Sequence, residues 1–209
     1  MPLTGSQASI EWAAAHAATI TPGVFPGPMR EDTIRYFAEC QARHGRKVDP
    51  NKISIMVDCY VADSKDRAIE EYGEYLMYLF NTLLRYDQVW QKEVNKTGYY
   101  SSTAFEHLRN GAQGTLAEDS TVFNEWTLET VRGAAQNMPL GTADEIVERI
   151  VAEGDDAGAN NVLLVCNRGH MPQDMYLNQI RRIGKEVLPR LQAHNVTCVP
   201  HAETRLAAE

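Results

Sequence analysis

The segment GTADEIVERIVAEGDDAGANNVLLVCNRGHMP, residues 141–172, decides the fold class because it contains a helix, a strand and a polar loop with a clear boundary at each junction. The Thr142 hydroxyl is placed to cap a backbone amide while Glu145, three residues later, reaches back to the cap, and this capping box predicts a helix start. Apolar residues follow at helical spacing until Gly154 and Gly158. A helix is therefore expected to begin at Thr142 and to end at these glycines.

A strand and a second helix follow the first helix. The run Val162–Cys166 is apolar without alternation, which predicts a strand covered on both faces in a parallel sheet. The polar loop Asn167–Pro172 comes next, and an apolar stripe from Leu177 to Leu191 predicts a helix in which Pro189 is an irregularity. This order of strand, loop and helix is the repeating unit of a βα-barrel.

The same order occurs earlier in the chain. Asp63 and Ser64 are the expected cap of a long helix that follows an apolar strand. The expected elements are a helix from Ser6 or Gln7 to His16, a weak strand Ala17–Thr21, a helix Thr33–His44 ended by Gly45, a strand Lys52–Val61, and a helix from Arg67 to about Tyr86.

These elements predict an α/β fold, namely a partial (β/α)8 TIM-type barrel with at most about four βα units, where a closed barrel needs eight strands and about 250 residues. Residues 1–195 are the expected barrel domain, with a helical insertion at about 88–140, and residues 196–209 are a C-terminal tail. A half barrel leaves strand edges open. The missing strands are therefore expected from another chain or copy, or the sequence is the C-terminal piece of a longer protein whose Met1–Ser6 segment is a strand end and loop.

Composition narrows the class of protein. The 209 residues are 44% hydrophobic with a net charge of −8, which argues against nucleic-acid and membrane partners because both are anionic. The chain shows no run long enough for a membrane span and no signal-peptide pattern, so a cytoplasmic protein is expected. The four cysteines lack C-x-x-C spacing and are expected to be buried free thiols. Neither a metal site nor a hydrolase signature is found among the dispersed histidines.

Several segments together resemble one known family. These are GTADEIVER (141–149), AGANNVLL (157–164), Met171-Pro172 with a helix ending EVLPRL (186–191), YVADSKDRA (60–68) and GSQASIEWAA (5–14). They are similar to the C-terminal half of the luciferase-like flavin-dependent monooxygenases. The combination is fairly specific, whereas G-T-x-x-E alone opens many unrelated helices.

The resemblance implies an oxidoreductase that uses reduced flavin mononucleotide and oxygen to oxidise an organic substrate, with the flavin supplied by a separate reductase. Hydride transfer with the deazaflavin F420 is the less favoured alternative. The protein would supply orientation, a dry pocket and a phosphate anchor. It would act as a homo-oligomer or with a complementing barrel half.

The expected cofactor-binding residues are Gly5, Ser6, Gln7 and Ser9, by resemblance to the family's flavin-phosphate loop. Gly5 would let backbone approach the phosphate, Ser6 and Ser9 would offer hydroxyls, and Gln7 would contribute its amide. The alternative is that Ser6 is a simple N-cap and Ser9 an ordinary first-turn residue.

Other polar residues carry open alternatives. Arg168 and His170 follow a strand, where barrels place active sites, and are either at the pocket mouth or in an ordinary surface loop. Asp58 and Tyr60 either face the barrel interior or form a hydrogen-bonded core pair. His107 lies in the insertion, which is a lid or a subunit contact.

No residue of this chain is assigned a catalytic role, because in the family the absent early strands carry much of the flavin and substrate pocket. The competing hypothesis is therefore a non-catalytic, flavoprotein-like remnant or subunit-association module that keeps a partner surface and has lost the chemistry.

Overall fold

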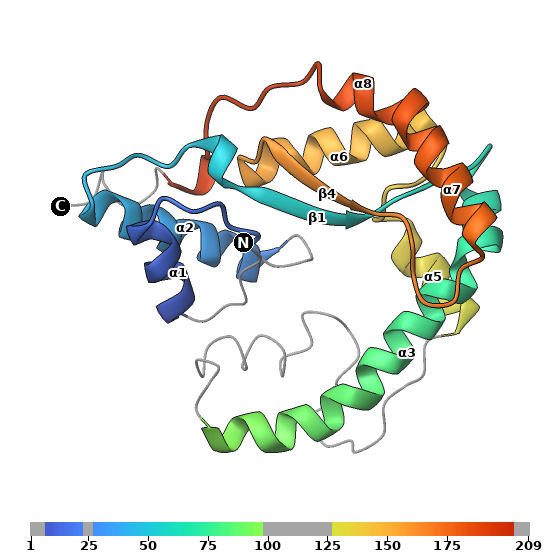
Figure 1. Cartoon of the computed structure of the whole chain (residues 1–209), viewed down its shortest axis with the longest axis horizontal. Coiled ribbons are helices and arrows are strands. Elements are labelled where there is room, and N and C mark those ends of the chain that lie inside the picture. Colours follow the sequence, from blue (N-terminus) through green and yellow to red (C-terminus); the bar gives the residue numbers. More distant parts are fainter. Residues whose placement is uncertain (1–6, 23–26, 98–126, 203–209) are drawn as a thin grey trace. The chain divides into compact units, whose positions relative to one another are not determined.

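The computed structural model describes residues 7–22, 27–97 and 127–202, and it separates into two units. The first unit comprises Met1–Val57, Glu148–Leu164 and Arg190–Glu209; the second comprises Asp58–Val147 and Val165–Pro189. The helices and strands, drawn in Figure 1, are α1 (Gln7–Ala15), α2 (Pro28–Arg43), β1 (Ser54–Asp58), β2 (Tyr60–Val61), α3 (Lys65–Thr97), α5 (Leu128–Ala135), β3 (Leu140–Gly141), α6 (Ala143–Ala157), β4 (Asn161–Val165), α7 (Gln173–Arg182) and α8 (Leu188–Leu191).

The capping box predicted at the start of α6 is confirmed. The Thr142 backbone N–H donates to Glu145 Oε2 over 2.8 Å, and the Glu145 N–H donates to Thr142 Oγ1 over 3.3 Å. Gly141 precedes the box at φ +132°, and a Cβ on it would run into the Glu145 carboxylate. Helix α6 continues through Gly154 and ends before Gly158, which has φ +64°, so of the two predicted terminating glycines only Gly158 ends the helix.

The first unit is built on neighbouring parallel strands. β4 pairs with β1, and Figure 1 shows their arrows pointing the same way. Ile20 forms an isolated parallel bridge to Ile53, so the predicted weak strand Ala17–Thr21 is reduced to this bridge. Ile20, Ile53 and Ile55 are almost fully buried. The βα order with parallel pairing agrees with the expected α/β class, and the strands described form two-stranded sheets without a closed barrel.

Strand β4 differs from its prediction. It was expected to be covered on both faces, but Leu163 is 49% exposed and Val162 and Leu164 are only half-buried. Alternate residues of a strand point to opposite faces. Val162 lines a small cavity with Ile150 and Val151 of α6, whereas the described residues leave the opposite face, which carries Leu163, open.

A buried ion pair links two helices of the first unit. Arg30 in the first turn of α2 is 1% exposed, and its Nη1 lies 3.3 Å from Glu153 Oε2 on α6. Arg149 adds a second contact, with Nε 3.2 Å from Glu153 Oε1. Burial lowers the pKa of Arg30 and the attraction of Glu153 opposes this shift. Glu153 therefore compensates a cation that has been removed from water.

Replacing Glu153 by Gln is expected to lower the free energy of unfolding by about 3 kcal/mol, because Arg30 would remain buried without its counter-charge. Chemical denaturation measures the change. Glu148→Gln on the exposed side of α6 is the matched control and should leave stability nearly unchanged. Equal effects of the two substitutions would contradict a stabilising role for the buried pair.

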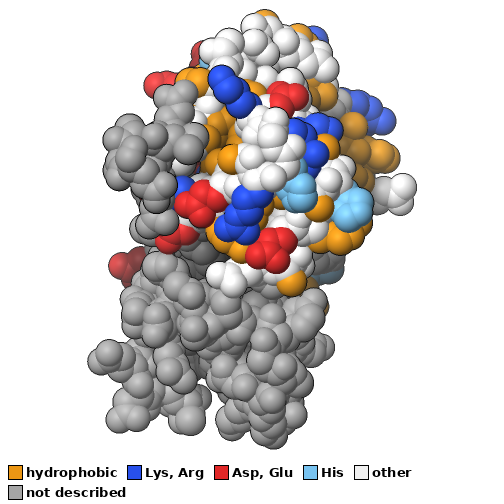
Figure 2. Space-filling view, turned by 90° about the vertical axis from the view of Figure 1, so that its left-hand side faces the viewer, with side chains coloured by type: hydrophobic (Ala, Val, Ile, Leu, Met, Phe, Trp, Pro, Cys, Tyr) orange, Lys and Arg blue, Asp and Glu red, His pale blue; other side chains and the backbone are white. Residues whose placement is uncertain are grey.

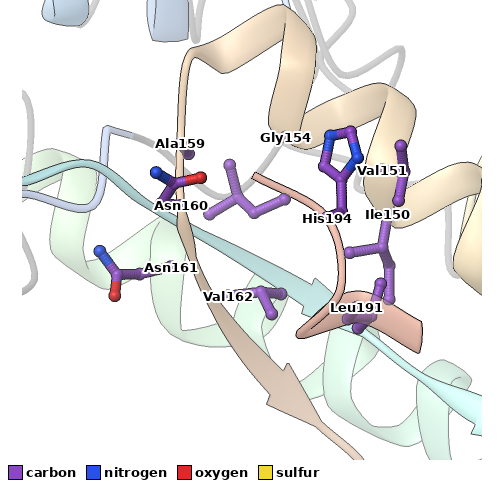
Figure 3. A pocket seen from close by; sticks show the side chains of 10 residues that line it. Ile150, Val151, Gly154, Ala159, Asn160, Asn161, Val162, Leu191 and His194 are labelled. Atoms are coloured by element: carbon purple, nitrogen blue, oxygen red, sulfur yellow. The ribbon is translucent and has the colours of Figure 1, made fainter. Parts of the chain in front are cut away.

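The segment after α8 is held more firmly than predicted. Residues 196–209 were expected to be a loose tail, yet Val196 and Val199 are 6% and 5% exposed. Asn160 clamps this segment, since its Nδ2 donates to Val196 O over 2.9 Å and its Oδ1 accepts from Val196 N over 2.7 Å. Figure 3 shows Asn160 and His194 on the wall of the small cavity beside β4. Residues 203–209 lie outside the described part of the chain.

The Gly158→Ala substitution is expected to destabilise the first unit by at least about 1 kcal/mol, since the residue has a left-handed φ. An added Cβ would also lie 2.5 Å from the Val199 Cα. Thermal unfolding and limited proteolysis of residues 193–202 measure the effect. Gly184→Ala, where nothing lies within 4 Å of the added Cβ, is the control and should not destabilise the protein, because alanine is favoured over glycine in a helical turn.

The second unit packs α3 against β2, β3 and α5. β2 and β3 are parallel, with Tyr60 opposite Leu140 and Val61 opposite Gly141. Gln179 of α7 is 1% exposed and joins this sheet, because its side chain accepts from Val61 N over 2.8 Å and donates to Val61 O over 3.0 Å. The core members are Tyr60, Ala62, Ala68, Ile69, Tyr72, Tyr75, Leu76, Val131, Ala135, Leu140 and Met171.

Three predicted elements have different bounds in the structure. The predicted strand Lys52–Val61 is divided into β1 and β2 at Cys59. Helix α3 begins at Lys65, where the Arg67 N–H donates to Ser64 Oγ over 3.1 Å, and continues to Thr97. The predicted insertion at 88–140 therefore starts inside a helix. Helix α2 begins at Pro28 rather than at Thr33, with proline in the first turn where its missing N–H is tolerated.

The helix predicted up to Leu191 is interrupted by a π-helical turn, Ile183–Val187, between α7 and α8. The Leu188 N–H donates to Ile183 O, five residues back. Pro189 follows directly, and it lacks an N–H and would crowd a regular helical turn. The irregularity expected at Pro189 is thus accommodated by one wide turn.

The cysteine prediction is partly wrong. Cys40 and Cys59 are buried free thiols, whereas Cys166 is half-buried and Cys198 is exposed. Burial raises the pKa of Cys59 to about 12, so this thiol is unreactive near neutral pH. Among the helices that the structure describes, none is long and apolar enough to cross a membrane.

Candidate functional site

The phosphate-type loop predicted at the N-terminus is only partly described. Gly5 and Ser6 lie outside the described residues. Gln7 is the exposed first residue of α1, and Ser9 is half-buried in the first turn of this helix. The helix start expected at Ser6 or Gln7 is confirmed, while the binding role of Gly5, Ser6, Gln7 and Ser9 stays a prediction.

A hydrogen-bonded polar group of the second unit joins the end of β1 to the loop after β4. Asp58 is the last residue of β1 and is 6% exposed. Arg168 donates to both of its carboxylate oxygens, from Nε to Oδ1 over 2.7 Å and from Nη2 to Oδ2 over 2.9 Å. Tyr72 of α3 donates a third hydrogen bond to Asp58 Oδ1 over 3.2 Å. This bidentate geometry fixes the guanidinium plane and leaves N–H donors of Arg168 for another acceptor.

Asp58 and Tyr60 do not form the core pair that the sequence left open. Tyr60 instead donates from its hydroxyl to Glu71 Oε2 over 2.9 Å, and its ring stacks on Tyr72 with centroids 4.9 Å apart. Burial and hydrogen bonds to carboxylates raise the pKa of both Tyr60 and Tyr72. Both phenols are therefore protonated at neutral pH and donate to their partners.

The loop after β4 is packed on α3. His170 is exposed and meets Tyr75 and Tyr78 edge-on, with centroid distances of 5.2 and 5.0 Å. Gly169 has φ +59°, and a Cβ on it would lie 2.7 Å from the Tyr78 ring. Arg168 and His170 were predicted either at a pocket mouth or in an ordinary loop. In the structure Arg168 pairs with the buried Asp58, and His170 contacts the rings of Tyr75 and Tyr78. His107 lies outside the described residues.

The pKa of Tyr72 predicts a pH dependence of stability. An unfolded tyrosine loses its proton near pH 10, while folded Tyr72 retains it because its pKa is raised. The unfolded state then binds fewer protons, so the free energy of unfolding falls as pH rises above about 10, by up to about 1.4 kcal/mol per pH unit for each such group.

Tyr72→Phe should reduce this alkaline slope, whatever its effect on stability at neutral pH. Denaturant unfolding at a series of alkaline pH values measures the slope. Tyr78→Phe, at a side chain 51% exposed, is the control. An identical slope in wild type and Tyr72→Phe would show that Tyr72 does not hold its proton more tightly in the folded state.

A surface groove of about 500 Å³ lies between α1 and α2 in the first unit. Trp12 is 48% exposed there and stacks on His16 with centroids 4.3 Å apart. Arg43 lies 5.8 Å above the Tyr36 ring, and a hydrogen bond to Glu11 raises the pKa of Tyr36 to about 12. Figure 2 shows acidic, basic, histidine and apolar side chains interspersed on this side, without a patch of one charge.

Sequence reasoning singled out Asp58 and Arg168 separately but missed their pairing. They are 110 residues apart, so no local spacing connects them. The positions of the two residues could have indicated the pairing. A carboxylate at the end of an apolar strand and a cation just after a parallel strand lie at the same edge of the sheet. Helix α3 supplies Tyr72 as a partner of Asp58 and Glu71 as a partner of Tyr60, and no feature of the sequence indicated either contact.

No metal site is found in the part of the chain that the structure describes, where no three histidine, cysteine, aspartate or glutamate side chains are grouped to hold an ion.

Parallel strands joined through helices, with a polar cluster where β1 and β4 end, define an α/β protein of the TIM-barrel type. Solved structures support this class. The chain superposes on the oxygenating constituent of 3,6-diketocamphane monooxygenase from the CAM plasmid of Pseudomonas putida, a complex with FMN, with a TM-score of 0.57 and 17% identity over 90% of this chain and 47% of that one. It also superposes on monooxygenase RslO1 from Streptomyces bottropensis, with a TM-score of 0.54 and 18% identity over 90% of this chain and 46% of that one.

Residues 3–161 match the family model described as luciferase-like monooxygenase, and the chain belongs to this family. A curated relative, protein y4vJ of Sinorhizobium fredii, is 20% identical over 148 residues, which are 71% of this chain and 36% of the relative. The chain thus spans less than half the length of these relatives. The resemblance drawn from the sequence is confirmed.

Proposed function

We propose that this chain is the C-terminal part of a luciferase-like, flavin-dependent monooxygenase, in which reduced flavin and oxygen oxidise an organic substrate. Family membership over residues 3–161 is the observation that carries the proposal. The FMN complex of the 3,6-diketocamphane enzyme favours FMN over F420. A separate reductase would supply the reduced flavin.

The residue types at the start of α1 support a phosphate site there. Its first turn contains no acidic residue, whereas α2, α3, α5, α6 and α7 each carry an aspartate or glutamate there. The backbone amides at the start of a helix and the helix dipole favour an anion at such a position. In the proposed function, Gly5, Ser6, Gln7 and Ser9 bind the flavin phosphate, and the flavin supplies the oxygen chemistry.

The remaining strands of the barrel are proposed to come from polypeptide outside this sequence. The open face of β4, with Leu163 49% exposed, is a surface that such strands and their helices would cover. Catalysis would then require the completed barrel. The alternative function is a non-catalytic, flavoprotein-like remnant. The open face of β4 is compatible with this alternative as well, because a partner could bind to that face without any catalysis.

Titration of FMN, followed by its fluorescence, tests the proposal. Saturable binding is expected, and Ser6→Ala with Ser9→Ala should weaken it by about 1 to 3 kcal/mol through loss of hydrogen bonds to a charged group. The control is Thr127→Ala with Thr130→Ala, which removes hydroxyls from the start of α5 instead. Unchanged affinity in the serine variant would assign that loop to capping, and absence of saturable binding would favour the remnant.

A further inference from the structure

Three tyrosines occur at every third position of α3 in the sequence EYGEYLMY, residues 71–78. Tyr72, Tyr75 and Tyr78 therefore lie along one side of the helix. The rings of Tyr72 and Tyr75 are 6.3 Å apart between centroids, and the Tyr72 ring also stacks on Tyr60 at 4.9 Å. His170 contacts both Tyr75 and Tyr78, at 5.2 and 5.0 Å. The rings of Tyr60, Tyr72 and Tyr75 thus form a series of direct contacts, and the His170 ring links Tyr75 to Tyr78.

The series runs from the core of this unit to its surface. Tyr72 is 0% exposed, Tyr60 is 2% and Tyr75 is 6%, whereas Tyr78 is 51% exposed. Around the inner rings the core is rich in side chains that are easily oxidised: Met171 is buried in it, and Met77, Met138, Met175 and Tyr176 pack against it.

Each inner phenol has its own carboxylate. Tyr60 donates to Glu71 over 2.9 Å and Tyr72 donates to Asp58 over 3.2 Å. Burial, together with a hydrogen bond to Glu74, raises the pKa of Tyr75. Arginines hold two of these carboxylates in place, since Arg67 Nε lies 2.6 Å from Glu71 and Arg168 is bidentate on Asp58.

A carboxylate beside each phenol has a chemical consequence. When a phenol loses an electron it becomes a very strong acid, and it must also lose its proton to avoid an uncompensated charge in a medium of low dielectric constant. A hydrogen-bonded carboxylate accepts that proton without any movement of the ring. Packing alone requires neither a carboxylate on every inner phenol nor rings in continuous contact.

We propose that Tyr60, Tyr72, Tyr75 and Tyr78 form a relay that carries an oxidising equivalent between the core of this unit and the surface, one electron at a time. Its role would be to reduce a one-electron oxidant of the oxygen-radical class in the interior, and to pass the resulting oxidising equivalent to the surface, before methionine or cysteine is oxidised. Only this role rests on the proposed monooxygenase function; the relay itself requires no flavin.

The relay step balances for electrons and protons. An oxidant takes one electron from Tyr72, whose proton passes to Asp58, giving a neutral tyrosyl radical, a neutral carboxylic acid and the reduced oxidant. Tyr75 then returns an electron to Tyr72 as the Asp58 proton moves back, and the Tyr75 proton passes to Glu74. Tyr78 then returns an electron to Tyr75 across the His170 ring, the Glu74 proton moves back to Tyr75, and the Tyr78 proton passes to water. A thiol or ascorbate in solution reduces the Tyr78 radical.

The relay can be tested by oxidising the protein from its surface with a photogenerated ruthenium(III) polypyridyl complex, which is too large to enter the core. The oxidising equivalent would then move inward from Tyr78. Oxidation in water followed by rapid freezing and electron paramagnetic resonance should show a tyrosyl radical whose power saturation is unaffected by added paramagnetic salt, as expected of a buried site. Loss of this signal in the Tyr60→Phe, Tyr72→Phe double variant would assign it.

Tyr75→Phe and Tyr78→Phe should each abolish the buried signal although Tyr60 and Tyr72 remain. Tyr78 is exposed, so its variant is expected to fold even if another does not. The control Tyr36→Phe, in the first unit, should retain the signal. A buried radical that persists in the Tyr78→Phe variant, or a wild-type protein that yields only solvent-exposed radicals, would overturn the relay. Neither result depends on FMN binding.

Discussion

The second unit depends on the burial of one carboxylate, Asp58. A charge at the end of an apolar strand is stable only when it is paired and fully hydrogen-bonded. Arg168 supplies the opposite charge from the loop after β4, and Tyr72 supplies a further donor from α3. This one interaction therefore fixes the position of a strand end, a loop and a long helix within the unit.

The first unit solves the same physical problem with different residues. Arg30 and Glu153 are buried together and Arg149 adds a second cation. In this case the pair joins helices rather than a strand and a loop. Among the described residues, each unit thus contains one deeply buried carboxylate, Asp58 or Glu153, and each of these contacts an arginine that is distant in sequence.

Local signals allowed the sequence to predict helix starts and the order of elements. The capping box at Thr142 and the cap at Ser64 depend only on neighbouring residues, and both form. Burial depends on distant parts of the chain, so it was predicted less well: Leu163 was expected to be covered and is exposed, and Val199 was expected to be loose and is buried. Of the candidate site, Asp58 and Arg168 were recognised as residues, whereas their geometry and Tyr72 required the fold.

The clamp on Val196 by Asn160 sets the order in which the chain can fold during synthesis. The first unit includes helices α1 and α2 and the segment around Val199, which is synthesised long after these helices. Its packing against Gly158 cannot form until then. Helix α2, which packs against Pro200–Ala202, therefore lacks this contact until that segment has been synthesised.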